Sequence, residues 1–345
     1  MDAIGALGAI ISGRTLTREE ARATMGSVMA GEATGAQLGA LLATLHLRGE
    51  TVDEIVGFAE AMRSAAVPVT LSAEAIDIVG TGGSRVDPFN ISTTSSLVAA
   101  AAGARVAKHG NRAATGRCGS ADVLEALGVR IDLGPDEAAR CVDEAGVAFL
   151  FAPRYHPAMR HASPVRREIR IRTVFNILGP ISNPAGVRRM VLGVATPQVG
   201  ESIARSLGEL GADHVLVVHG EDGLDDISPT GPTRTWELRG GTVTTGSIDP
   251  ASLGLPVGTV VEIESGDAAA NAATTRAVLS GEAGTRRTAV LLNAGAGLFV
   301  AGVADSLREG VLLAAAAIDS GAATAALERF VSTSQRLGAA AAAPA

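Results

Sequence analysis

The first part of the chain places apolar residues at helical spacing. From residue 15 to residue 66 they recur every three or four positions, and a threonine precedes each of three such runs. The expected N-caps are Thr17, Thr34 and Thr51, and the expected helix stops are Gly31 and Gly49. The pattern predicts an all-helical unit at the start of the chain.

After residue 80 short apolar runs alternate with amphipathic stretches. The expected strands cover residues 76–79, 104–107, 148–151, 190–195, 214–219 and 289–292, and the expected helices 92–102, 120–127, 135–145 and 198–210. Residues 233–248, with a Gly-Gly turn, predict a β hairpin. This alternation is typical of an α/β fold, in which a mainly parallel central sheet is flanked by helices.

The two patterns divide the chain into two domains and a tail. We expect a small all-helical domain over residues 1–70 and a larger α/β domain over residues 71–335. The alanine-rich residues 336–345 are expected to be a disordered tail, because chain ends without apolar periodicity are seldom ordered.

Composition narrows the functional classes. The 345 residues are 47% hydrophobic and carry a net charge of −7, which argues against general binding of nucleic acid. Cys118 and Cys141 have no metal-site or disulfide spacing. With no signal peptide and no apolar run of about 18 residues, we expect a cytoplasmic protein without a membrane partner.

The first candidate site is "IDIVGTGGSRVDPFNISTTSS". A strand runs into a loop containing Gly80, Gly82 and Gly83, and a helix begins near Asn90 with more hydroxyls than a single cap needs. Glycines allow close approach of the backbone, and a helix N-terminus favours an anion. The spacing is neither a Walker loop nor a Rossmann fingerprint. A tight strand-to-helix turn is the structural alternative.

The second candidate is "KHGNRAATGRCGSAD", which contains the single lysine of the chain, Lys108. A basic residue at the carboxyl end of the next strand points toward the same crevice as the glycine loop. His109 and Arg112 add polar donors, and Asn111 adds an amide. The alternative is a polar surface loop.

The third candidate is "VVHGEDGLDDIS", where four acids follow a strand: Glu221, Asp222, Asp225 and Asp226. Such acids suit Mg²⁺, which combines carboxylates with waters and substrate phosphates. An acidic surface turn is the alternative here, as a solvated helix face is for the basic run "PVRREIRIRT". Together the three sites predict a phosphate-rich, Mg²⁺-bearing substrate between the two domains.

Six ordered blocks then suggest a family. "GTGG…FNIST", "AKHGNR…GSADVLEALG", "FLFAPRYHPAM", "PVRRE…RTVFNILGPISNPA", "VVHGEDGLDDIS" and "NAGAGL" resemble anthranilate phosphoribosyltransferases, from about Leu16 to Val331. The resemblance implies a helical domain, completed by helices near 164–183, beside an α/β phosphoribosyl-binding domain, in a homodimer joined through the helical domains. It also implies transfer of ribose 5-phosphate from phosphoribosyl pyrophosphate (PRPP) to anthranilate, in tryptophan biosynthesis, with no covalent nucleophile.

The resemblance also implies a role for particular residues. PRPP would be bound by Gly80, Gly83, Ser84, Asn90, Ile91, Ser92, Thr93, Lys108, His109, Gly110, Asn111, Arg112, Thr115, Gly116 and Ser120. Anthranilate would be bound by Gly80, Asn111, His156, Pro157 and Arg166, the arginine fork meeting its carboxylate. Mg²⁺ would be held by Ser92, Asp225 and Asp226.

Several positions depart from the family pattern. Ser84 stands where the glycine loop usually continues with Asp, and Asp87 is the candidate to replace that carboxylate. Thr115–Gly116 replaces a Ser-Ser pair, Asp226 replaces a Glu, Pro88 replaces a Thr or Ser, and Arg170 replaces a Gly. These changes concentrate around the expected PRPP and metal sites.

Three other functions remain open on the sequence. A paralogue with the same scaffold would use a different aromatic amine. A pyrimidine nucleoside phosphorylase shares the architecture but is not expected to carry "KHGNR" and "PVRRE". A catalytically silent binding protein of this fold, including one that binds nucleic acid, is opposed by the charge of −7.

Overall fold

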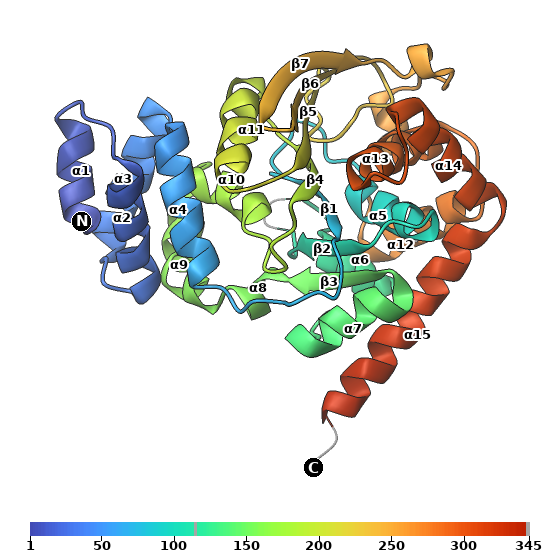
Figure 1. Cartoon of the computed structure of the whole chain (residues 1–345), viewed down its shortest axis with the longest axis horizontal. Helices are drawn as coiled ribbons and strands as arrows, with labels where there is room; N and C mark the ends of the chain where they lie inside the picture. Colours follow the sequence, from blue (N-terminus) through green and yellow to red (C-terminus); the bar gives the residue numbers. More distant parts are fainter. Residues whose placement is uncertain (114–115, 343–345) are drawn as a thin grey trace.

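The computed structural model describes residues 1–113 and 116–342. Four helices open the chain: α1 (Ala3–Ile11), α2 (Arg18–Ala30), α3 (Gly35–Arg48) and α4 (Val52–Ser64). The three predicted threonine N-caps are confirmed, and each forms a reciprocal capping box with the third residue of its helix. Gly31 and Gly49 end α2 and α3 at positive φ, as predicted. Local chemistry thus fixes the limits of this helical bundle, which stands at one end of the molecule (Figure 1).

The second region is built on a seven-stranded sheet in the order β3-β2-β1-β4-β5-β6-β7. The strands are β1 (Ile76–Gly80), β2 (Val106–Gly110), β3 (Val147–Phe151), β4 (Arg189–Gly193), β5 (His214–Gly220), β6 (Thr233–Arg239) and β7 (Thr242–Ile248). The first five are mutually parallel, and β6 and β7 form the predicted antiparallel hairpin. The expected α/β fold with a mainly parallel sheet is confirmed.

The expected strand at 289–292 is wrong. These residues lie inside the long helix α13 (Thr285–Ala301), which is buried along most of its length. A helix enclosed on all sides is apolar all round, so a short window of it has the same composition as a buried strand. The other predicted helices are found as α5 (Ile91–Ala101), α6 (Ser120–Leu127), α7 (Pro135–Ala145) and α11 (Gly200–Glu209).

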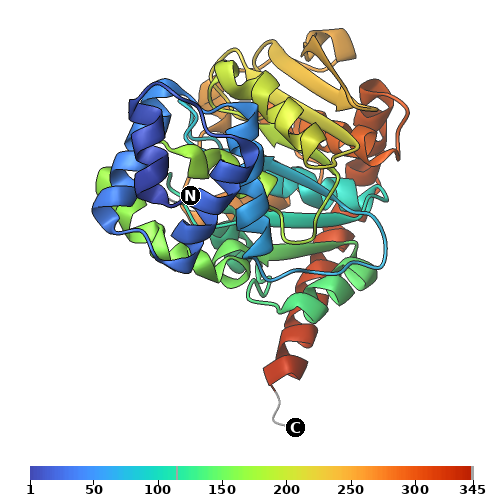
Figure 2. The same cartoon turned by 60° about the vertical axis from the view of Figure 1, so that its left-hand side comes forward.

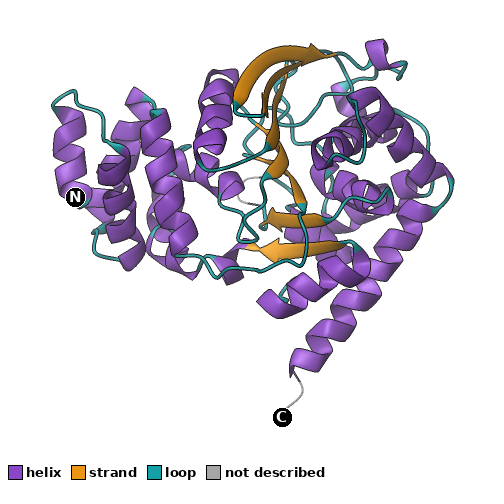
Figure 3. Ribbon diagram, viewed as in Figure 1, coloured by secondary structure: helices purple, strands orange, loops and turns teal. Residues whose placement is uncertain are grey.

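Helices cover both faces of the sheet (Figures 1 and 3). α5 and α13 pack on one face and α11 on the other. The remaining helices are α8 (Ala152–Tyr155), α9 (Ser163–Ile169), α10 (Val174–Ile181), α12 (Ala268–Leu279), α14 (Leu307–Asp319) and α15 (Ala322–Ala342). Short 3₁₀ turns occupy Pro157–His161, Pro197–Val199, Ala251–Leu253 and Val260–Ile263.

The predicted disordered tail is wrong as far as Ala342. α15 continues through this segment, because alanine is the strongest helix former. Leu337 is buried, and Gln335 Nε2 donates to the carbonyl oxygen of Gly128 at 2.9 Å. The last three residues, 343–345, lie outside the described chain.

Two helices far along the chain return to the N-terminal bundle. α9 packs against α3, and α10 packs against α3 and α4. Figure 2 shows them beside the bundle, between it and the sheet. The α9–α10 connection therefore lies where the two regions meet. Within the described residues no single helix is long and apolar enough to cross a membrane; α14 and α15 pass that test only as a pair bent by 73°.

Candidate active site

The glycine loop after β1 folds over an aspartate of another loop. Gly82 N–H donates to Asp225 Oδ2 at 2.7 Å, and Thr81 N–H donates to the carbonyl oxygen of Gly193 at 2.8 Å. A Cβ at Gly80 would collide with the Asp225 carboxylate, and one at Gly83 would collide with the Arg172 guanidinium. The glycines are thus needed for close packing of three chain segments.

The N-terminus of α5 opens beside this loop. Its N-cap, Asn90, makes no capping hydrogen bond, because its amide donates to the carbonyl oxygen of Cys118 at 3.1 Å and accepts from Asn271 at 2.9 Å. The first-turn N–H groups consequently lack the side-chain partner that usually satisfies them, which is the arrangement that binds anions at helix starts.

The hydroxyl run at the start of α5 divides into two groups. The hydroxyls of Thr94, Ser95 and Ser96 donate to backbone carbonyls within the fold. Ser92 Oγ instead accepts from Lys108, and the buried Thr93 hydroxyl has no partner among the described residues. Only the first two hydroxyls are therefore available to a ligand.

Lys108 lies beneath this helix start, with 3% of its surface exposed. Its Nζ donates to the carbonyl oxygen of Ile78 at 2.7 Å and to Ser92 Oγ at 3.3 Å. Burial lowers the pKa of the ammonium group, while Asp77 and Asp226 oppose that shift. Strand β1, strand β2 and the start of α5 thus meet at one cation.

Two of the four acids after β5 are used by the fold. Glu221 pairs with Arg234 at 3.1 Å, and Asp222 accepts from Ser228 at 2.5 Å and Thr230 at 2.6 Å. Of the other two, Asp225 accepts from Gly82 N–H; burial raises the pKa of both the Asp225 and the Asp226 carboxyl, and Asp225 raises that of Asp226 further.

Two adjacent carboxylates of raised pKa fit a divalent cation, whose charge would relieve both burial and repulsion. Among the described residues no cluster of three or more His, Cys, Asp or Glu side chains surrounds this point. The protein donors present would therefore supply part of a coordination shell, the usual situation for Mg²⁺ shared with a phosphorylated substrate.

An asparagine of α13 holds the acidic loop. Asn293 Oδ1 accepts from Ile227 N–H at 3.0 Å, and Asn293 Nδ2 donates to the Ile227 carbonyl oxygen at 2.9 Å. Both groups are buried, so the two bonds fix the backbone directly after Asp226.

His109, the residue after Lys108, lies together with His156. Their ring centroids are 5.1 Å apart, both side chains are buried, and neither Nε2 has a partner within the described chain. Burial lowers the pKa of His109 to about 3 and that of His156 to about 4, so both rings are neutral at pH 7.

Comparison with known proteins identifies the family. Residues 5–66 match the model of the glycosyl transferase family helical bundle domain, and residues 72–324 match its a/b domain. Anthranilate phosphoribosyltransferases of Rhodopseudomonas palustris and Methylorubrum populi are 50% and 52% identical over 328 residues, which cover 95% of this chain and 97% of each relative. The chain belongs to the anthranilate phosphoribosyltransferase family.

Solved structures of anthranilate phosphoribosyltransferases superpose over nearly the whole chain. The enzyme of Thermus thermophilus has a TM-score of 0.91 at 45% identity, covering 97% of this chain and 100% of its own. The enzyme of Saccharomyces cerevisiae, solved in complex with PRPP and Mg, has a TM-score of 0.89 at 25% identity and covers 97% and 98%.

The anthranilate phosphoribosyltransferase resemblance suggested Arg166, His156 and Pro157 for the acceptor. Arg166 lies 5.3 Å from the centroid of Phe175 and makes no ion pair with a described carboxylate, and burial lowers the pKa of its guanidinium. Pro157 follows His156 at the start of a 3₁₀ turn. A half-buried guanidinium without a carboxylate partner is suited to an anionic ligand.

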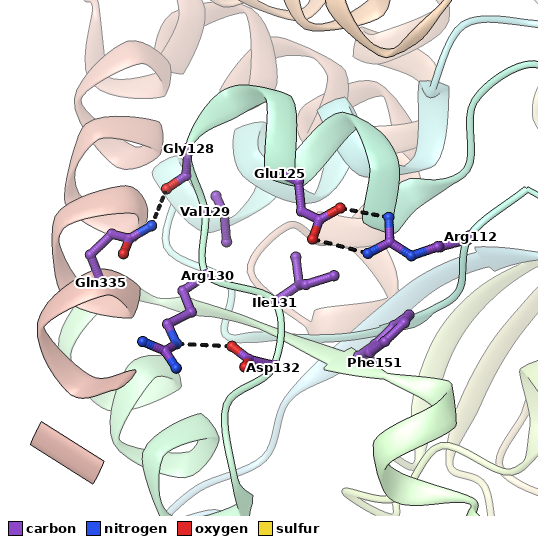
Figure 4. Close-up of a pocket in the computed structure, with 9 residues that line it drawn as sticks. All are labelled: Arg112, Glu125, Gly128, Val129, Arg130, Ile131, Asp132, Phe151 and Gln335. Atoms are coloured by element: carbon purple, nitrogen blue, oxygen red, sulfur yellow. Dashed lines mark hydrogen bonds and ion pairs between the residues drawn. The ribbon is translucent and has the colours of Figure 1, made fainter. Parts of the chain in front are cut away.

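Arg112 is engaged elsewhere. Its guanidinium pairs with Asp122 at 2.8 Å and Glu125 at 2.5 Å and lies over Phe151, in a cavity of about 510 Å³ beside α6 and α15 (Figure 4). The family resemblance implies that Arg112 binds PRPP, but in the structure its charge is already neutralised by these two acids. In the structure Arg112 fixes the second loop to α6.

The rest of the second loop is only partly described. Gly110 leaves no room for a side chain beside Ser120 and Phe149, and Ser120 Oγ donates to the carbonyl oxygen of Asn111 at 3.1 Å. Thr115 lies outside the described residues, while Gly116 lies against Asp87.

Asp87, the candidate to replace the missing glycine-loop carboxylate, lies against the second loop. It accepts from Arg117 N–H at 3.4 Å and thus joins the two loops. Ser84 is bonded to the carbonyl oxygen of Val86 and also lowers the pKa of Asp225 by hydrogen bonding. A hydroxyl rather than a carboxylate therefore lies beside the acidic pair.

Two residues of the site escaped sequence reasoning. Arg172 donates to the carbonyl oxygen of Gly82 and lies near Asp225. In the sequence it is one of four arginines in the basic run "PVRREIRIRT", and the family resemblance gave a role only to Arg166. Asn293 was visible only as the first letter of "NAGAGL". Neither contact could be read from spacing, because each joins segments distant in the sequence.

Proposed function

We propose that the chain transfers the 5-phosphoribosyl group of PRPP to the amine of anthranilate and releases pyrophosphate, with Mg²⁺ as the metal, in tryptophan biosynthesis. The observation that carries the proposal is the meeting of Lys108, the uncapped start of α5 and the Asp225–Asp226 pair at one sheet edge. Family membership over nearly the whole length supports the same reaction.

The donor side is an anion site. The N–H groups of Ser92 and Thr93 and the ammonium of Lys108 would bind the diphosphate, and Asp225, Asp226 and Ser92 would hold Mg²⁺. The N–H group of Ile91 donates to the carbonyl oxygen of Phe89. When bound, the metal stabilises negative charge on the diphosphate. As the bond from C1 to pyrophosphate breaks, the residues in place meet the departing charge without rearranging.

The acceptor side is cationic and otherwise neutral. Arg166 would bind the anthranilate carboxylate as a two-pronged donor, and the rings of His109 and His156 are neutral at pH 7. The arylamine is unprotonated near neutral pH, so no side chain must take a proton before the nitrogen bonds to C1. The role of the protein is to orient two substrates and to stabilise charge.

One assay tests this function. The purified protein is mixed with anthranilate, PRPP and Mg²⁺, and the loss of anthranilate fluorescence is followed with time. We expect loss that requires all three components and is abolished in Arg166→Ala at low anthranilate. Absence of any loss at high protein concentration would refute the proposal, and faster turnover of a different aromatic amine would assign the acceptor to that amine instead.

We also propose a homodimer joined through the helical bundle. The outer helices α1 and α3 expose Ile4, Ile11 and Leu47, the last to 88%. Exposed apolar side chains grouped on packed helices are typical of a surface that another chain covers. Light scattering at micromolar concentration should give twice the mass of the chain, and Leu47→Glu should reduce it to one chain. A monomeric wild-type protein contradicts this proposal.

A further inference from the structure

Strands β1 and β2 separate after their first residues. Their ladder contains the single pair Ile76 and Val106, whereas β1 with β4 and β2 with β3 are paired along their whole length. In Figure 3 the arrows of β2 and β3 lie across the view, while the strands beyond β1 rise through it. The gap opens at the carboxyl ends, directly beside Lys108.

Polar side chains take the backbone groups that the opened ladder leaves. His109 N–H donates to Asp77 Oδ2 at 3.2 Å, and the carbonyl oxygen of Ala107 accepts from Asn183 Nδ2 at 2.8 Å. The same Asn183 Nδ2 donates to Asp77 Oδ2 at 2.8 Å. Together with the bond from Lys108 to the opposite strand, these contacts replace direct pairing.

Replacing direct backbone pairing by a buried carboxylate costs free energy. Asp77 is fully buried, and its Oδ1 has no partner among the described residues. Burying a carboxylate costs free energy that direct backbone pairing, as between β2 and β3, would avoid. A closed ladder would bring the end of β2 against β1 and take away the space in which the Lys108 side chain lies.

We propose that Asp77 and Asn183 are positioning residues that hold the end of β2 away from β1 and so place Lys108 for the diphosphate. Neither residue touches the substrate in this arrangement; both act through the backbone on either side of Lys108. The inference rests on the proposed PRPP site and adds to it the two residues that shape it.

The test compares disruption with conservative replacement. Asp77→Ala removes the acceptor for His109 N–H, Asn183→Ala removes the donor to Ala107, and Asp77→Asn keeps an acceptor without the charge. Val106→Ala, a buried deletion in the same strand, is the control for lost stability. Binding of PRPP with Mg²⁺ is measured by calorimetry without anthranilate, and steady-state kinetics give kcat and both KM values.

We expect Asp77→Ala and Asn183→Ala to weaken PRPP binding about tenfold or more, as loss of a buried hydrogen-bonded partner implies, with the KM for anthranilate little changed. Asp77→Asn should restore most of the affinity, and Val106→Ala should keep it. If Asp77→Ala does not fold, Asn183→Ala decides.

Two results would overturn different claims. Wild-type protein that does not bind PRPP would refute the proposed function. If the wild type binds PRPP and Asn183→Ala binds it with equal affinity, the positioning role alone is refuted. The same holds if Asn183→Ala loses no more affinity than Val106→Ala when the two variants have the same melting temperature.

Discussion

The guanidinium of Arg172 donates a hydrogen bond of 2.5 Å to the carbonyl oxygen of Gly82, and so joins the α9–α10 connection to the glycine loop. A second bond of 3.4 Å reaches Thr81 Oγ1. The connection follows α9, which contains Arg166. One continuous segment therefore supplies a residue to the expected donor site and another to the expected acceptor site. Arg172 therefore links the expected acceptor segment to the glycine loop.

Replacing Arg172 by Gln should loosen the glycine loop. A hydrogen bond from a charged donor contributes about 1.5–3 kcal/mol, so kcat/KM for PRPP should fall roughly tenfold or more. The KM for anthranilate should change less. Arg167→Gln, at an exposed position of α9, is the control, and equal kinetics in the two variants would contradict the link.

Arg170 is a residue whose backbone conformation favours glycine. It ends α9 with φ at 52°, the single positive φ at a described residue other than glycine. The left-handed conformation costs an L-residue about 1–2 kcal/mol. Glycine avoids this cost but loses more conformational entropy on folding, which offsets part of the gain. Arg170→Gly should raise the free energy of unfolding by roughly 1 kcal/mol in urea titrations.

The same substitution at Arg167, three residues earlier, should change stability in the opposite direction. Arg167 lies inside α9, where glycine costs about 1 kcal/mol relative to a good helix former. Arg167→Gly should therefore lower stability. If Arg170→Gly lowers it too, the conformation at residue 170 is not strained.

Local chemistry explains what could be predicted from the sequence. Thr17, Thr34 and Thr51 satisfy N–H groups three residues away, so their caps depend on nothing distant. The apolar runs predict strands that end at Gly80 and just before Lys108; Gly80 is the last residue of β1, whereas Lys108 lies inside β2. Distant contacts could not be predicted this way: residues 289–292 were expected to form a strand because α13 is buried on all sides, which gives a short window of it the composition of a buried strand.

The acidic loop illustrates the same limit within the site. Sequence spacing cannot distinguish Asp222, which is bonded to two hydroxyls of its own turn, from Asp225, which meets the glycine loop. The family resemblance made that distinction. For Arg112 the resemblance implied a role in PRPP binding, whereas the structure pairs its guanidinium with two acids of α6.

The buried histidines predict a loss of stability in acid. The unfolded chain binds a proton at His156 below pH 6.5, whereas the folded chain does so only near pH 4. Stability is therefore complete above pH 6.5 and falls as the pH drops from 6.5 to 4, by about 2 kcal/mol at pH 5 for this one residue at about 1.4 kcal/mol per pKa unit.

His156→Gln removes this titration. The difference in unfolding free energy between pH 7.5 and pH 5 should be about 2 kcal/mol smaller in the variant than in the wild type. His46→Gln, at an exposed position, is the control. An unchanged difference in His156→Gln would mean that the imidazole is protonated in the folded protein at pH 5.

Asn293→Leu should impair the use of Mg²⁺. The change leaves the buried Ile227 N–H and carbonyl without partners and frees the backbone that follows Asp226. We expect the Mg²⁺ concentration for half-maximal activity to rise several-fold. Leu292→Ala, a buried neighbour that makes no bond to the loop, is the stability control, and the same Mg²⁺ dependence in both variants would exclude a role for Asn293 in holding the acids.

Lys108→Arg keeps the charge and tests the shape of the site. The ammonium lies 2.7 Å from the Ile78 carbonyl oxygen and 3.3 Å from Ser92 Oγ, with 3% of the residue exposed. A planar guanidinium is wider and cannot make both contacts from the same point. The chain contains 29 Lys and Arg residues, and Lys108 is the only lysine among them. The affinity for PRPP should fall roughly tenfold or more, as for a lost charged hydrogen bond, and wild-type kinetics in Lys108→Arg would show that the diphosphate binds elsewhere.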